Sequence, residues 1–148
     1  MTTKLTKFNE LNQILRLYMI NSHRLFSKYT ENLNLTPQQS RTLSYIERHP
    51  GIIQRELADN FHLRGASASN MLKNLERDGY IIRKNDPASA RVKRIYLTQY
   101  GQKTIVSIRK AFSKINDDAS HDLDEEQLDE LIHLLKNLNK HLEDFIDK

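Results

Sequence analysis

Apolar residues recur close to heptad spacing near the start of the chain, and this pattern predicts one long amphipathic helix over about residues 5–33. Its apolar stripe consists of Phe8, Leu11, Leu15, Tyr18, Leu25, Tyr29 and Leu33. A second stripe, with spacings of three and four, consists of Leu128, Leu131, Leu135, Leu138, Leu142 and Phe145. The first stripe needs a partner surface, and the second has more apolar surface than one small domain would cover by itself.

Three signals mark the start of a second helix. Thr36 is a favoured N-cap, Pro37 fits the first helical position, and Gln39 stands three residues after the cap, which completes a capping box. The predicted helix stops at His49-Pro50-Gly51, because proline and glycine cannot continue it.

Two shorter helices follow in close succession. The first is predicted around residues 54–61, and a tight connection through residues 63–65 leads to the second, which ends near Asp78-Gly79. Gly79 is placed to end that helix in a left-handed conformation. The predicted buried face of the second helix consists of Ala68, Met71, Leu72 and Leu75. Two short helices joined this closely indicate a helix-turn-helix.

Residues 80–98 are rich in β-branched and aromatic side chains and predict a hairpin, with strands over residues 80–84 and 92–97 and a turn at Asn85-Asp86-Pro87. We expect Arg91 at its tip. After Gly101, a helix that contains Ile105, Ile108, Phe112 and Ile115 leads to a last helix, which Asp124 can cap together with Gln127.

The charges of this 148-residue chain are segregated along the sequence, which its net charge of +4 hides. Residues 61–110 contain 11 Lys and Arg against 3 Asp and Glu, whereas residues 117–148 contain 3 against 11. The first of these segments attracts a polyanion and the second would repel it.

Several functional classes are excluded or disfavoured. The chain has no cysteine, which excludes disulfides and thiolate metal sites. It has no membrane-length apolar run and no secretion signal at its start, so we expect a cytoplasmic protein without membrane contact. No Ser-His-Asp spacing, glycine-rich phosphate loop or pair of catalytic carboxylates stands in a convincing context, so we expect neither an enzyme nor a cofactor. The six histidines are spread out, and no closely spaced pair of His or carboxylate ligands stands out except around His121, Asp117 and Asp122. We expect no metal site, with zinc sensing as an alternative.

The order helix, helix, helix-turn-helix, basic hairpin and two helices resembles a MarR-family regulator along essentially the whole chain. Leu57-Ala58, followed by residues 72–81, LKNLERDGYI, resembles the family's third helix and its recognition helix. Residues 86–101, DPASARVKRIYLTQYG, resemble its wing signature, an Asp and an Arg followed by Leu-Thr and a glycine. The chain departs from the family pattern at Asn70, often an arginine, at Ser89, often acidic, and at Ile53, often a Ser or Thr that caps the third helix.

The expected fold is therefore mainly α with a small β-hairpin wing: a winged helix-turn-helix with N- and C-terminal dimerisation helices. We predict a single domain over residues 1–148, with dimerisation helices at about 5–33 and 100–147 and the winged helix-turn-helix at about 36–98.

The polar face of the recognition helix suits the major groove, because Asn can pair with adenine and Lys can reach a phosphate or guanine. A solvated helix face is the alternative. Arg91 is expected in the minor groove, Lys93 and Arg94 on phosphates, and Gln38 at a phosphate near a helix N-terminus. The candidate DNA-binding residues are Gln38, Arg64, Ser67, Ser69, Asn70, Lys73, Asn74, Arg91, Lys93 and Arg94.

Asp86 is expected to stabilise the wing by accepting hydrogen bonds from wing backbone or from Arg91, with an ordinary turn aspartate as the alternative. The resemblance implies a pocket for a small aromatic or anionic effector, with Arg16, His23 and Tyr45 as candidates. Surface charge and packing are their alternative roles.

The predicted function is a sequence-specific regulator of transcription, acting as a homodimer and repressor on a pseudo-palindromic double-stranded DNA operator and released by a small effector. A winged-helix module for protein interaction is one alternative, and a zinc-responsive DNA-binding regulator is another.

Overall fold

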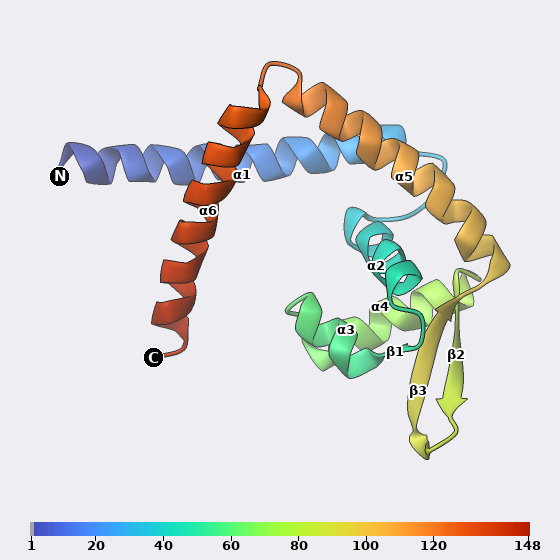
Figure 1. Ribbon diagram of the computed structural model, residues 1–148. Coiled ribbons are helices and arrows are strands. Elements are labelled where there is room, and N and C mark those ends of the chain that lie inside the picture. The colour runs from blue at the N-terminus through green and yellow to red at the C-terminus, as the bar shows by residue number, and fades with distance from the viewer. Residues whose placement is uncertain (1) are drawn as a thin grey trace. The chain divides into compact units, whose positions relative to one another are not determined.

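The computed structural model describes residues 2–148, and Figure 1 shows a mainly helical chain with one small sheet. The elements are α1 Thr3–Tyr29, α2 Pro37–Arg48, β1 Ile52–Ile53, α3 Gln54–Asn60, α4 Gly65–Arg77, β2 Ile81–Asp86, β3 Ser89–Leu97, α5 Gln99–Ser120 and α6 Glu125–Ile146. The chain forms two compact units, of which the first ends at Ser113 and the second is Lys114–Lys148. The predicted fold class is confirmed.

Both predicted capping boxes are formed. The Gln39 N–H donates to Thr36 Oγ1 over 3.1 Å, and the Thr36 N–H donates back to the Gln39 side chain over 3.0 Å. Asp124 and Gln127 make the same reciprocal pair at the start of α6, at 2.8 and 3.0 Å. Two of the chain's helix starts are thus fixed by side chains within four residues.

The first helix ends earlier than the apolar stripe predicts. It stops at Tyr29, and the Leu33 N–H donates to the Thr30 carbonyl in a turn. Asn34 has a positive φ of 50°, so the chain reverses there instead of continuing the helix. Leu33 therefore packs, together with Leu35, against the core of the first unit.

The sheet is antiparallel with the order β1-β3-β2. Strand β1 was not predicted; it pairs Ile52 with Ile95 of β3. The predicted hairpin exists, but its strands extend further than expected, and its turn holds Pro87 and Ala88. The register shifts between Asn85 and Asp86, which brings Asp86 opposite Ser89.

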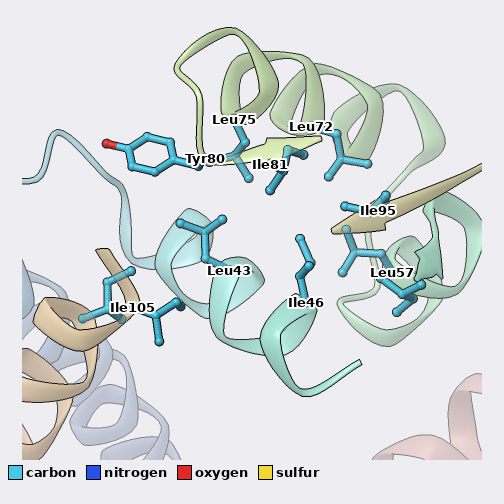
Figure 2. Packing of buried hydrophobic residues seen from close by; sticks show 11 residues of the cluster. Leu43, Ile46, Leu57, Leu72, Leu75, Tyr80, Ile81, Ile95 and Ile105 are labelled. Carbon is cyan, nitrogen blue, oxygen red and sulfur yellow. The ribbon is translucent and has the colours of Figure 1, made fainter. Parts of the chain in front are cut away.

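The core of the first unit lies where α2, α4 and the sheet meet. Figure 2 shows Leu43 and Ile46 of α2 facing Leu72 and Leu75 of α4. All four side chains are at most 1% exposed. Leu57, Tyr80, Ile81, Ile95 and Ile105 complete the labelled cluster. The apolar face predicted for α4 is thereby confirmed, with Met71 at its partly buried edge.

The segment between α4 and α5 is held by backbone and hydroxyl contacts. Gly79 has a φ of +85° and follows the C-cap of α4, as predicted. The Tyr80 hydroxyl donates to the Leu33 carbonyl over 3.1 Å, and Thr98 Oγ1 donates to the Gly79 carbonyl. At Gly101, a Cβ would collide with the Tyr80 carbonyl oxygen, so α5 begins in close backbone contact.

The second unit contains the end of α5 and all of α6. No residue of α6 is buried, and its exposed apolar side chains include Leu131, Leu142 and Phe145. Within residues 2–148, no helix has the length and apolar character needed to cross a membrane.

Candidate nucleic-acid interface

Helix α4 presents the polar face that its sequence predicts. Ala68, Leu72 and Leu75 point into the core because they recur at helical spacing. The opposite positions Ser67, Asn70, Lys73 and Asn74 are exposed, and Ser69 is half-buried at the margin. Arg64 is the exposed N-cap residue, and no side chain caps α4. Five predicted residues and Arg64 therefore belong to one helix whose outer surface is free of bulky apolar groups.

The Asp86 carboxylate holds the wing in shape. It accepts from the Ala88 N–H over 2.8 Å and from Arg94 Nε over 2.8 Å. The backbone hydrogen bond from Ala88 is the largest effect and lowers the pKa of Asp86; burial opposes it, and the hydrogen bond and charge of Arg94 lower the pKa further. The expected bond with wing backbone is thus confirmed, whereas Arg91 as its side-chain partner is wrong. The register pairs Arg94 with Lys84, and from there its guanidinium reaches Asp86, two residues further along β2.

Arg94 also fastens the wing to the rest of the unit. Its Nη1 donates to the Gly51 carbonyl over 2.9 Å, just before β1. The Gly51 N–H in turn donates to the Ile95 carbonyl over 2.9 Å. Because two guanidinium nitrogens are used within the protein, Arg94 has a structural role that the sequence prediction of a phosphate contact did not include.

Arg91 and Lys93 are exposed on β3. The turn is formed by Pro87 and Ala88, so the expectation that Arg91 occupies the hairpin tip is wrong. Strand β3 begins at Ser89 because the register shift shortens the turn. Both side chains remain on the projecting ribbon seen in Figure 1.

A clamp that sequence reasoning missed joins α4 to the wing. Arg83 of β2 donates from its backbone N–H and Nε to Glu76 Oε2, each over 3.2 Å, and from Nη2 to Oε1 over 3.0 Å. The side-chain hydrogen bonds from Arg83 outweigh burial and lower the pKa of Glu76. We call this pair the Glu76–Arg83 clamp. Opposite charges seven residues apart across a helix end could have suggested it.

The remaining predicted residues belong to α1 and α2. Gln38 is exposed in the first turn of α2, and Arg16 and His23 are exposed along α1. Tyr45 stacks on His49, with ring centroids 4.1 Å apart, and meets Phe61 edge-on.

Tyr45 also borders a cavity of about 530 Å³, which we call the aromatic cavity. Phe61 and Phe112 line it with Tyr45, and Arg41, Arg48 and Arg109 are at its rim. Arg109 is paired there with Glu47. Arg16 and His23 do not line this cavity, so the structure does not unite the three predicted effector residues. Among residues 2–148, no group of three or more His, Asp or Glu side chains is arranged to hold a metal ion.

Comparisons with known proteins agree with the fold described above. Residues 33–92 match the family model described as MarR family. An uncharacterized HTH-type transcriptional regulator of Bacillus cereus is 32% identical over 126 residues, which cover 82% of each chain. The HTH-type transcriptional regulator SarZ of Staphylococcus haemolyticus is 27% identical and covers 86% of this chain and 87% of its own length.

Solved structures show the same fold. The S. aureus MepR–DNA complex has a TM-score of 0.80 at 26% identity, over 87% of this chain and 94% of that one. A mutant E. coli MarR complexed with operator DNA has a TM-score of 0.82 at 20% identity, over 93% and 99%. The B. cereus and S. haemolyticus relatives are HTH-type transcriptional regulators. The chain belongs to the MarR family of winged helix-turn-helix transcriptional regulators.

Proposed function

We propose that this chain represses transcription as a homodimer bound to a pseudo-palindromic operator in double-stranded DNA. The carrying observation is the Glu76–Arg83 clamp, which fixes the wing against the C-terminal end of α4. The clamp therefore holds α4, which suits the major groove, and the basic ribbon in a fixed relative position. Two elements that enter neighbouring grooves of one DNA duplex need such a fixed position. The structures of MepR with DNA and of MarR with operator DNA support the proposal.

Two features support a second copy of this chain as the dimer partner. Helix α1 exposes apolar side chains such as Leu17 and Tyr18, and α6 exposes Leu131, Leu142 and Phe145. The sequence of α1 holds five Lys and Arg against one Glu, whereas that of α6 holds two Lys against six Asp and Glu. Two helices that expose apolar side chains and carry opposite net charges suit each other across an interface. In the proposed dimer, α1, α5 and α6 of two copies interdigitate and place two α4 helices about one DNA turn apart.

Selection of bound duplexes from a random pool tests the DNA-binding part. We expect an inverted repeat whose affinity exceeds that of scrambled DNA by at least ~1,000-fold. Binding without an enriched sequence would contradict the proposal and favour the protein-interaction alternative. Loss of operator affinity on adding a chelator would favour the zinc-responsive alternative. Sedimentation at micromolar concentration tests the dimer, and a monomer there would contradict it.

The aromatic cavity supports release by a small aromatic anion. Its apolar walls suit an aromatic ring, and the exposed Arg41 and Arg48 at its rim suit a carboxylate. Benzoate is the first probe: we expect millimolar benzoate to weaken operator binding by the wild type but not by an Arg41→Gln variant. Equal weakening of both proteins would contradict this location.

Reporter expression tests repression. A rise in expression on deletion of the gene would support repression, and a fall would indicate activation.

A further inference from the structure

A second hollow, of about 710 Å³, lies between the start of the helix-turn-helix and the wing, entirely within the first unit. We call it the wing hollow. Helix α3 contributes Arg55 and Asp59 to its lining, and β3 contributes Arg91 and Lys93. Gly65, the first residue of α4, lies at its border, and a Cβ there would meet open space. The wing hollow thus lies between α3 and β3, beside the first residue of α4.

The lining of the wing hollow has an apolar floor and a positive rim. Ala58 and Ile95 are buried in its floor. Arg83 also lines it, but its guanidinium is occupied by Glu76. Arg55 and Arg91 are exposed, and within residues 2–148 neither side chain forms an ion pair or hydrogen bond. Two guanidinium groups are thus available to a ligand, and the lining contains one carboxylate, that of Asp59.

We propose that the wing hollow seats the sugar–phosphate backbone of the bound DNA and that Arg55 contacts a phosphodiester there. A strand whose bases face α4 and whose neighbouring groove receives the ribbon must carry its backbone between the two elements. The wing hollow borders both the start of α4 and the ribbon, and it offers Arg55 on one side and Arg91 on the other. Arg55 was absent from the sequence-predicted contacts because α3 showed no basic cluster. This inference rests on the proposed function and adds a contact to it.

Asp59 gives the proposal a second consequence. Its carboxylate is exposed on the same helix, four residues after Arg55, and would repel a phosphate in the wing hollow. Removal of that charge should therefore strengthen DNA binding. A gain of this kind cannot arise from damaged folding.

The experiment measures fluorescence anisotropy of labelled operator and scrambled duplexes between 50 and 200 mM salt, with full-length wild type, Arg55→Gln, Asp59→Asn and the charge control Lys103→Gln. We expect Arg55→Gln to weaken binding to both duplexes by the same factor. Its salt slope should fall by about one per subunit, so the affinity lost over this salt range shrinks by about threefold per subunit. We expect Asp59→Asn to bind both duplexes about threefold more tightly, and Lys103→Gln to match the wild type.

Three outcomes would overturn the proposal. Arg55→Gln and Asp59→Asn could both match the wild type. Arg55→Gln could weaken operator binding alone, which would indicate a base contact. Inorganic phosphate could compete with DNA better than chloride at equal ionic strength, in the wild type and not in Arg55→Gln, which would indicate a free-anion site. If no operator is found, the proposed function fails, whereas the measurements on scrambled DNA still test the wing hollow.

Discussion

Helix α4 and helix α6 carry similar amphipathic patterns but bury them to different extents. Leu72 and Leu75 of α4 are at most 1% exposed, whereas Leu142 and Phe145 of α6 are 59% and 74% exposed. Both helices have apolar residues at spacings of three and four. A stripe in the sequence therefore shows that a helix needs a partner surface, and only the fold shows whether its own chain supplies one. The four predictions below test this difference.

The largest effect is expected from truncation in the core of α4. Leu72→Ala should lower the free energy of unfolding by about 2–5 kcal/mol, because the side chain is fully buried and leaves a cavity. Urea denaturation followed by circular dichroism measures this loss. Leu142→Ala is the matched control, at a protein concentration low enough to keep the chain monomeric. An equal loss in both variants would remove the contrast between the helices.

Truncation of the α6 stripe should act on self-association. We expect Leu131→Ala combined with Leu142→Ala to weaken dimerisation at least about tenfold, since both side chains are exposed in the single chain. The unfolding midpoint of the wild type should rise with protein concentration, and that of the double variant should rise less. Lys140→Ala, on the same helix, should behave as wild type. A wild-type midpoint independent of concentration would contradict this prediction.

Tyr80 tests the edge of the core. Tyr80→Phe should lose about 0.5–1.5 kcal/mol, because the hydroxyl donates to the Leu33 carbonyl. Burial, together with Tyr100, raises the pKa of Tyr80 from 10.0 to about 12. Folding thus favours the protonated phenol, whose contribution is fully present below pH 10 and is lost as the pH rises toward 12. Thermal unfolding from pH 8 to 12 should show the stabilities of the wild type and Tyr80→Phe converging.

The smallest effect is expected at the surface, in the Glu76–Arg83 clamp. Glu76→Gln should cost about 0.5–1 kcal/mol at neutral pH, because Glu76 is 39% exposed there. The clamp lowers the pKa of Glu76 below 4.5, so its contribution is present above that pH and is lost as the pH falls through the lowered pKa. Unfolding measured from pH 7 down to pH 3 should show the difference in unfolding free energy between the wild type and Glu76→Gln shrinking to zero.

Local features of the fold were predictable from the sequence. The capping boxes at Thr36 and Asp124 involve residues three apart, and Gly79 needs only its own backbone conformation. The exposed residues of α4 follow equally from helical periodicity. These predictions succeed because the interactions that decide them lie within a few residues.

Long-range features were missed for the opposite reason. Strand β1 exists because Ile52 pairs with Ile95, far along the chain, and two residues leave no periodic signal. Arg94 reaches Asp86 because the register pairs Arg94 with Lys84, on the same strand as Asp86, and no local pattern records that register. In the candidate site, the sequence therefore identified the helix and the hairpin that present side chains to DNA. It did not identify which arginines, such as Arg83 and Arg94, are bound within the protein.

The close approach at Gly101 also limits how this sequence can vary. Because even a methyl group would strike the Tyr80 carbonyl oxygen, the entry of the polypeptide into α5 permits a single residue type. In a saturation library selected for folded protein, position 101 should retain glycine alone, whereas Gly65, with open space around it, should accept many residues. A lineage that loses this glycine would have to rebuild the junction between the wing and α5. Neutral substitutions at this position are therefore excluded as long as the fold is kept.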